Sequence, residues 1–231
     1  MPVRVLDSRA DGSADDVARG IRWATAHGAR VINLSLEFSA GFDNCRNLRT
    51  VCEAIDRANR AGVFVVGAAG NAGLDHAEMP ARKAFAVASS TIRGCISDFS
   101  SRGTDVAITA PGGGSDAPGA GSQCAPQKHG PGVTQLTLTN GQHGTFLDFG
   151  YPFYEGTSMA APHVSAAAGL VLSSGLLRKR LGHTPSPRQL GAWLACTARD
   201  PYDEAAASLY GAGLLDLGAA LDRRSCPELW P

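Results

Sequence analysis

The chain has 231 residues, of which 44% are hydrophobic and 18% are charged, so it can form one globular domain with a substantial core and is not a disordered tail. Its 21 Lys and Arg balance 21 Asp and Glu, and a formal net charge of 0 favours neither nucleic acid nor an anionic membrane as a partner. No apolar run approaches the roughly 18 residues of a membrane span, and the N-terminus lacks the basic-then-apolar order of a signal peptide.

The first half of the chain alternates between strand and helix patterns. Val17, Ile21 and Ala24 have helical spacing after Ser13, a residue type suited to capping a helix. The strand patterns are apolar throughout, which is typical of a parallel sheet with helices on both faces. We expect strands at residues 3–6, 31–36, 63–69, 85–88 and 106–108, and helices at residues 14–27 and 47–60.

The second half begins with a long loop. Residues 111–132 are rich in Gly, Pro and Ser, which indicates a surface loop. Asn140-Gly141, flanked by residues 135–139 and 144–149, predicts a hairpin. Further helices are expected at residues 157–174, 186–196 and 214–221. The whole pattern predicts an α/β fold in which residues 1–231 form a single domain.

Six cysteines, an even number without Cys-x-x-Cys spacing, favour three disulfides over a zinc site. The spacing does not fix the connectivity, and we expect neighbouring cysteines to pair. The pairs are then Cys45 with Cys52, Cys95 with Cys124, and Cys196 with Cys226. The alternative is six buried free thiols in a cytosolic protein.

Ser158 lies at a predicted loop-to-helix junction, within the string Gly-Thr-Ser-Met-Ala-Ala-Pro-His at residues 156–163. Unpaired N–H groups and the helix dipole favour negative charge there, so the hydroxyl is a candidate nucleophile. The alternative, more common for a serine at a helix start, is a simple N-cap. The string lacks the second glycine of Gly-x-Ser-x-Gly, which disfavours an α/β-hydrolase.

A second polar residue follows a predicted strand. The strand at residues 63–69 ends in Gly70-Asn71-Ala72-Gly73, and ligands of open parallel sheets bind outside the carboxyl ends of the strands. The glycines do not have the spacing of a dinucleotide-binding fingerprint. Asn71 is therefore either a turn residue beside Gly70 or part of a binding site.

The string at residues 156–163 resembles the nucleophile motif of the subtilisin-like serine proteases, or subtilases. Other segments resemble landmarks of that family in the family's order, and the likeness covers about residues 1–222. The resemblance implies a three-layer sandwich with a mostly parallel sheet. The segments are residues 29–36 (Ala-Arg-Val-Ile-Asn-Leu-Ser-Leu), 66–71 (Val-Gly-Ala-Ala-Gly-Asn), 99–103 (Phe-Ser-Ser-Arg-Gly), 110–112 (Ala-Pro-Gly) and 210–214 (Tyr-Gly-Ala-Gly-Leu).

The resemblance also implies roles for individual residues. Ser158 would attack a peptide carbonyl, and the Asn71 side chain would stabilise the oxyanion together with the Ser158 N–H. The substrate would lie between the end of one strand and the loop after the next. The implied substrate-binding residues are Ser35, Leu36, Ala68, Ala69, Gly70 and Thr157, and the alanines and glycine suggest an uncharged primary pocket.

The sequence departs from the family in one important respect. The Asp-Thr/Ser-Gly and His-Gly-Thr strings that supply the family's aspartate and histidine do not occur upstream of the other landmarks, where the family has them. His-Gly-Thr occurs only at residues 143–145, between the landmarks at residues 110–112 and 156–163. His163 lies about 140° around the predicted helix from Ser158, so it points away, and His76 has no role in the family. Residues 2–7 resemble the family strand that follows the histidine helix. We therefore expect Met1 to be an internal position, with the N-terminal strands and the histidine helix missing.

Two functions are compatible with this sequence. The first is a serine endopeptidase that acts on peptide or protein substrates and is inactive without an N-terminal segment supplying aspartate and histidine. The alternative is a pseudoprotease that binds peptides or partners through the same cleft. An intact protein of this kind is expected to be extracellular or periplasmic.

No cofactor and no metal are expected. The acidic residues Asp11, Asp15 and Asp16 do not have the spacing of a calcium loop and suit a solvated helix start instead. Glu37, where the family usually has glycine, is expected to face solvent; the alternatives are that its side chain narrows the subsites or meets a basic substrate residue. With its N-terminal part missing, the isolated chain is expected to be unstable or to aggregate.

Overall fold

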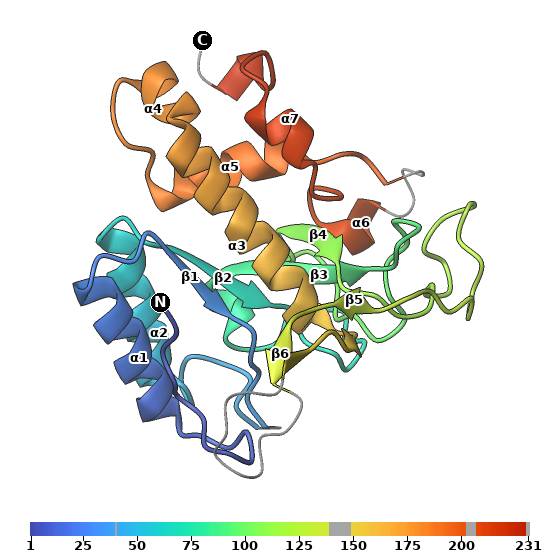
Figure 1. The fold of residues 1–231 in the computed structure, drawn as a ribbon, viewed down its shortest axis with the longest axis horizontal. Helices are drawn as coiled ribbons and strands as arrows, with labels where there is room; N and C mark the ends of the chain where they lie inside the picture. The colour runs from blue at the N-terminus through green and yellow to red at the C-terminus, as the bar shows by residue number, and fades with distance from the viewer. Residues whose placement is uncertain (40, 139–148, 202–206, 230–231) are drawn as a thin grey trace.

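The computed structural model describes residues 1–39, 41–138, 149–201 and 207–229. A four-stranded sheet in the order β1-β2-β3-β4 forms its centre (Figure 1). Every neighbouring pair of these strands is parallel, so the predicted parallel sheet is confirmed. The strands are β1 (Val31–Leu34), β2 (Phe64–Ala68), β3 (Phe85–Ser90) and β4 (Ile108–Pro111).

Helices cover both faces of the sheet, as predicted. Val65 belongs to a core shared with α1 and α2, and Val66 belongs to a core shared with α3 and α5. Successive strand residues point to opposite faces, which explains why these two neighbours enter different cores. Figure 1 shows α3 crossing the sheet diagonally. The helices are α1 (Ala14–Ala26), α2 (Arg49–Arg60), α3 (Thr157–Ser174) and α5 (Pro187–Cys196).

Shorter elements complete the described chain. Two antiparallel strand pairs precede α3. The pair β6 with β7 overlaps the predicted hairpin arms, and the pair β5 with β8 lies outside them. The predicted Asn140-Gly141 turn lies outside the described residues. The short elements are β5 (Val133–Thr134), β6 (Thr137–Leu138), β7 (Phe149–Gly150), β8 (Phe153–Tyr154), α4 (Leu176–Leu181), α6 (Ala207–Tyr210), α7 (Leu217–Leu221), and 3-10 turns at Ala81–Lys83 and Pro227–Leu229.

Local sequence signals account for several helix boundaries. The Ser13 side chain accepts a hydrogen bond from the Asp16 N–H at 3.1 Å, which caps α1 as predicted. In α5, Ser186 and Gln189 form a reciprocal capping box ahead of a proline in the first turn. Helix α3 has the predicted bounds, with Pro162 in its second turn.

The predicted strand at residues 3–6 is wrong. These residues have no strand structure, and Val3 and Val5 pack against the core under α1 instead. The close approach is made possible by Gly20 of α1, where an added Cβ would collide with a Val5 methyl group. A segment forms a strand only where a neighbouring strand can pair with it, and this segment packs against helix α1 instead.

Three disulfides join the cysteines, and the expected neighbouring pairs are confirmed. They are Cys45–Cys52, Cys95–Cys124 and Cys196–Cys226. All six thiols are used, so the alternative of six free cysteines is wrong.

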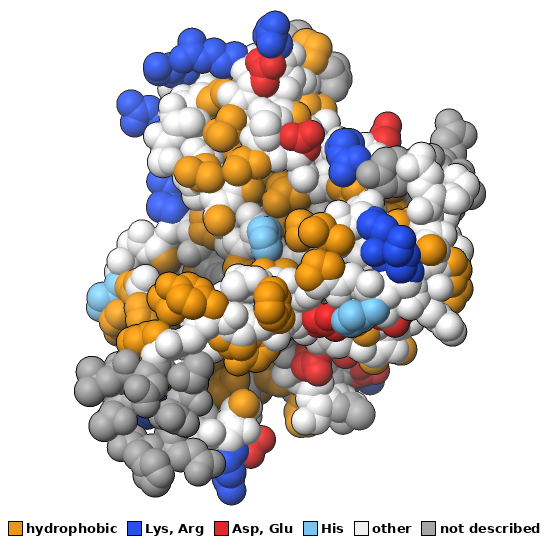
Figure 2. All heavy atoms as spheres, turned by 45° about the vertical axis from the view of Figure 1, so that its right-hand side comes forward, with side chains coloured by type: hydrophobic (Ala, Val, Ile, Leu, Met, Phe, Trp, Pro, Cys, Tyr) orange, Lys and Arg blue, Asp and Glu red, His pale blue; other side chains and the backbone are white. Residues whose placement is uncertain are grey.

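The surface carries charges of both signs. Figure 2 shows several Lys and Arg side chains at its upper end, with acidic side chains beside them and charges of both signs lower on the same face. Hydrophobic side chains lie across the middle of this face. In the described ranges, every helix is too short or too polar to cross a bilayer.

Candidate active site

Ser158 occupies the first turn of α3, at the edge of the sheet where the parallel strands end. Its side chain is half-buried, and neither its hydroxyl nor its backbone N–H forms a hydrogen bond with any described residue. The N–H groups of a first helical turn have no partner within the helix. Ser158 therefore combines an uncommitted hydroxyl with an uncommitted backbone donor.

Asn71 lies directly against this turn, as the resemblance implied. Its Oδ1 accepts hydrogen bonds from the Thr157 N–H at 2.9 Å and from the Thr157 hydroxyl at 3.1 Å. The same Thr157 hydroxyl accepts a hydrogen bond from the Gly70 N–H at 3.2 Å. Both bonds to Asn71 end on its oxygen, so they set the orientation of its amide group and leave the nitrogen as the donor end.

Ser35 joins the end of β1 to the same turn. Its hydroxyl donates a hydrogen bond to the Ser158 carbonyl oxygen at 2.8 Å. Asn33 supports this contact, because its amide donates to the Ser35 hydroxyl at 2.8 Å and its Oδ1 accepts from Ser165 of α3 at 3.0 Å. The carboxyl ends of β1 and β2 therefore both contact the turn that carries Ser158.

The remaining sequence-predicted residues form the surroundings of this turn. Ala68, Ala69, Gly70 and Thr157 are buried, whereas Leu36 is half-buried and Ser35 is exposed. The Thr157 side chain is buried, so it can affect a bound ligand through its hydrogen bonds to Asn71. The structure brings all the predicted site residues into one region, along two strand ends and one helix start.

A cavity of about 330 Å³ opens beside Asn71. Sequence reasoning missed Glu78, which lines this cavity, and expected Glu37, which also lines it, to face solvent. Glu37 is indeed exposed, but its carboxyl group lies in the neighbourhood of Glu78 and Asn71. The cavity is lined by residues 37–39, 41–43, 72, 74 and 76–79.

The pKa of Glu37 reports on this environment. Burial raises the pKa of its carboxyl group above the ordinary value, and the negative charge of Glu78 adds to the rise. Hydrogen bonding from the side chain and backbone of Asn71 acts in the opposite direction without cancelling it. Two carboxyl groups therefore repel each other at the entrance to this cavity.

No described histidine forms a hydrogen bond with Ser158. His163 Nδ1 contacts the Met159 carbonyl oxygen at 2.8 Å, on the exposed side of α3, and His76 lines the cavity beside Asn71. A serine–histidine contact does exist in the described chain, between Ser115 and His129 Nδ1 at 3.2 Å. His129 is an exposed residue whose Nε2 lies 3.1 Å from Glu155, and this surface contact involves neither Ser158 nor Asn71.

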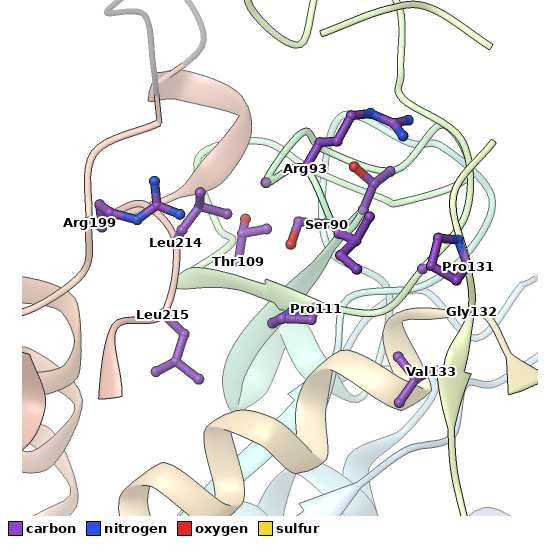
Figure 3. Close-up of a pocket in the computed structure, with 14 residues that line it drawn as sticks. Ser90, Arg93, Thr109, Pro111, Pro131, Gly132, Val133, Arg199, Leu214 and Leu215 are labelled. Atoms are coloured by element: carbon purple, nitrogen blue, oxygen red, sulfur yellow. The ribbon is translucent and has the colours of Figure 1, made fainter. Parts of the chain in front are cut away.

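A second cavity, of about 270 Å³, lies at the ends of β3 and β4 (Figure 3). It is lined by residues such as Ser90, Thr109 and Arg93, and it contains neither Ser158 nor Asn71. Arg93 is bound to Asp116, with Nε 2.9 Å from Oδ2. Burial acts to raise the pKa of Asp116, but hydrogen bonds from Arg93, Thr91 and the Ala125 N–H lower it below its ordinary value. This ion pair holds a surface loop in place.

Within the parts of the chain that the structure describes, no three His, Cys, Asp or Glu side chains are grouped so that they could hold a metal ion. The arrangement at Ser158 needs no metal for its chemistry. A hydroxyl beside two N–H donors suits nucleophilic attack on a carbonyl group, because the donors can stabilise the oxygen anion that forms.

Comparison with known proteins gives a consistent result. The model of the Subtilase family matches residues 1–213. The chain is 32% identical over 226 residues to a thermostable alkaline protease of Halalkalibacterium halodurans, covering 94% of this chain and 49% of that protein. It is 34% identical over 177 residues to thermitase of Thermoactinomyces vulgaris, covering 76% of this chain and 52% of that protein.

Solved structures agree with these sequence matches. A protease from Pseudoalteromonas arctica superposes with a TM-score of 0.73 at 29% identity, over 95% of this chain and 61% of that one. This superposition confirms the predicted α/β fold. The chain spans about half the length of the curated relatives it matches.

Proposed function

Because this chain belongs to the subtilase family of serine proteases, we propose that Ser158 is the nucleophile of a serine endopeptidase. The observation that carries the proposal is the pair of hydrogen bonds from Thr157 to Asn71 Oδ1, which hold the Asn71 amide beside the Ser158 turn. The substrates are peptides or proteins.

The reaction follows from this geometry. The Ser158 hydroxyl adds to the carbonyl carbon of a peptide bond and gives its proton to a base, and the carbonyl oxygen becomes an anion. The Asn71 amide and the Ser158 N–H donate hydrogen bonds to that anion. The base then gives this proton to the nitrogen as the intermediate collapses, so that the C–N bond breaks and the amine leaves. Water then hydrolyses the acyl group from Ser158.

The proposed reaction also needs a base and an aspartate that orients it. No described histidine contacts Ser158, and the family's Asp-Thr/Ser-Gly string does not occur in the sequence. His-Gly-Thr occurs only at residues 143–145, downstream of the place that the family's order gives it. We propose that both residues come from outside residues 1–231, which form one peptidase domain together with that segment. In subtilisin, a member of the same family, loss of the base costs about a millionfold in turnover, so this chain alone should be nearly inactive.

The nucleophile and oxyanion donors can be tested without a base. A peptide boronic acid forms a tetrahedral adduct with an active-site serine, and the adduct is seen by boron NMR and by intact mass. We expect an adduct with the chain, none with Ser158→Ala, and lower affinity with Asn71→Ala, because removing the corresponding donor in subtilisin itself costs about a hundredfold or more in turnover. An adduct that survives in Ser158→Ala, or no adduct with the unaltered chain, would contradict the proposal.

The absence of a described histidine beside Ser158 also supports a second candidate, a pseudoprotease that binds peptides without cleaving them. The genomic sequence upstream of Met1 distinguishes the two candidate functions. An in-frame Asp-Thr/Ser-Gly and His-Gly-Thr upstream of Met1 would exclude the pseudoprotease. Robust, phosphonate-sensitive cleavage of unfolded protein by residues 1–231 alone would instead show that the base lies within this chain.

The three disulfides support an oxidising location. We propose that the protein acts outside the cell or in a periplasm. Detection of the same three bridges in protein taken directly from the producing cells would test this, and reduced cysteines there would contradict it.

A further inference from the structure

The cavity beside Asn71 adjoins the residues that contact Ser158. Glu37 lies two residues after Ser35, whose hydroxyl binds the Ser158 carbonyl, and Ala72 follows Asn71 directly. Both Glu37 and Ala72 line the cavity. A peptide whose carbonyl oxygen is bound by Asn71 therefore has the side chain of that same residue close to the cavity entrance.

Glu78 is a fixed carboxylate in this cavity. Its Oε1 accepts hydrogen bonds from the Ser101 hydroxyl at 2.8 Å and from the Ala72 N–H at 3.3 Å. The carboxylate passes directly over Gly70, where an added Cβ would overlap with Oε1, and the φ of +107° at Gly70 also requires glycine. Oε2 has no hydrogen-bond or ion-pair partner among the described residues.

The two glutamates have no cation beside them in this part of the structure. The cavity lining contains no Lys or Arg. Three basic side chains on the neighbouring segments are paired elsewhere: Arg82 with Asp105, Lys83 with Asp56, and Arg102 with Asp75. No Lys or Arg in the lining therefore balances the negative charge of Glu37 and Glu78, and Asp43 in the same lining adds to it. The pKa of Glu37 is raised by burial and then by the charge of Glu78.

The other lining residues suit a long side chain with an apolar stem. Phe38, Phe42, Leu74 and Met79 line the same cavity of about 330 Å³. Lys and Arg bury their methylene groups against apolar surface while keeping the charged end with polar partners. Asp43 and His76 also line the cavity, but no three of the described His, Cys, Asp or Glu side chains are grouped so that they could hold a metal ion.

We propose that this cavity binds a Lys or Arg side chain of the substrate, so that the enzyme cleaves on the carboxyl side of basic residues. Glu78 binds the cationic end and Glu37 adds negative charge at the entrance. This differs from the uncharged pocket that Ala68, Ala69 and Gly70 suggested, because those three residues do not line this cavity and the carboxylates come from other segments. The inference rests on the proposed function for the identity of the ligand as a substrate residue.

The first experiment measures binding and needs no catalytic base. The probe is 4-aminobenzamidine, a fluorescent cation, compared with the neutral 4-aminobenzamide at pH 7 and low salt. We expect the chain to bind the cation at least tenfold more tightly, and Glu78→Gln to weaken cation binding about 10- to 100-fold, the range for a hydrogen bond to a charged group. The proposal is overturned by equal binding of the two probes, by no binding, or by an unaltered affinity in Glu78→Gln.

Two further variants control this experiment. Glu78→Gln keeps the Oε1 acceptor for Ser101 and Ala72, and an unchanged melting temperature would show that it folds. Glu37→Gln should weaken cation binding less than Glu78→Gln. Glu53→Gln, which removes a carboxylate on α2 that pairs with Arg49, should leave binding unchanged.

A second measurement separates this proposal from the proposed function. Peptide boronic acids ending in boro-arginine and boro-leucine are compared on the unaltered chain and on Ser158→Ala. A preference for boro-arginine that disappears in Glu78→Gln supports the pocket assignment. Equal adducts with both reagents would overturn it and leave Ser158 as the nucleophile. Selective amidine binding without any adduct would retain the pocket and contradict the assignment of Ser158.

Discussion

Asn71 uses the two ends of its side-chain amide for different purposes. The oxygen is occupied by the N–H and the hydroxyl of Thr157, and the nitrogen is the donor end, which serves the Glu37 carboxyl group as well as the proposed substrate oxygen. A single side chain is thus anchored to the helix that carries the proposed nucleophile. Because the anchor fixes the amide before a ligand arrives, little orientation entropy would be lost on binding.

Thr157 should affect ligand affinity through Asn71. Thr157→Val removes the hydroxyl that donates to Asn71 and accepts from the Gly70 N–H, while keeping a similar shape. We expect boronate affinity to fall about three- to tenfold, the value of one hydrogen bond. Thr157→Ser keeps the hydroxyl and should restore affinity. Loss of affinity in both variants would indicate packing, and loss in neither would remove Thr157 from the site.

Glu37 should make stability depend on pH. Folding raises its pKa through burial and the charge of Glu78, so the ionised carboxyl group destabilises the fold. This cost is absent below the unfolded-state pKa and fully present above the raised folded-state pKa. Glu37→Gln should therefore raise the melting temperature at pH 7 and give no advantage at pH 3. The gain should be small, because solvent screens an exposed side chain. A gain that persists at pH 3 would indicate a packing effect instead.

The site illustrates what residue patterns reveal. The approach of Asn71 to Ser158 was predictable, because the carboxyl ends of parallel strands meet at one edge and the motif string marks the helix start. The position of Glu78 was not predictable. It depends on the backbone path from Asn71 to Met79, which brings a carboxylate over Gly70, and only a glycine with positive φ leaves room for it. That glycine signals a close approach without identifying its partner.

At the scale of elements, Tyr210 connects segments that are distant in sequence. It lies at the end of α6 and is fully buried. Its hydroxyl accepts a hydrogen bond from the Ile96 N–H at 2.8 Å and donates one to the Ala120 carbonyl at 2.8 Å. The two loops that follow β3 and β4 are therefore held against the C-terminal part of the chain by one hydroxyl group.

Removing that hydroxyl should cost stability. Tyr210→Phe leaves a buried N–H and a buried carbonyl without this partner, and we expect the free energy of unfolding to fall by about 1–3 kcal/mol in urea titrations. Tyr151→Phe is the matched control, because Tyr151 is 71% exposed and its change should stay within about 0.5 kcal/mol. Equal effects of the two changes would contradict the role given to Tyr210.

Elements with strong internal signals could be predicted from the sequence, and elements that depend on a neighbour could not. Helix α3 has an apolar, alanine-rich sequence between Gly156 and Gly175, and its predicted bounds are correct. Helix α4 was not predicted, because it begins immediately after Gly175 and a glycine at such a position usually ends a helix. Residues 3–6 have a strand pattern, but their environment is a helix surface, which local pattern does not report.

At the scale of the whole molecule, the disulfides should differ in their contributions. Cys95–Cys124 and Cys196–Cys226 close loops of 29 and 30 residues, and Cys45–Cys52 closes one of 7. In the chain-entropy account, each longer loop stabilises by about 1 kcal/mol more than the short one. Double Cys→Ala variants measured by urea unfolding should show that order. A variant without Cys45–Cys52 that is the least stable would contradict it.

The free border of β1 has a consequence for handling the protein. In the described part of the chain, no strand pairs with the outer edge of β1, and a cavity of about 430 Å³ separates it from residues 1–5. Unsatisfied peptide groups along such a border can accept a strand from another molecule. Solubility, more than folding, should then limit the working concentration, and light scattering should increase steeply as the solution is concentrated.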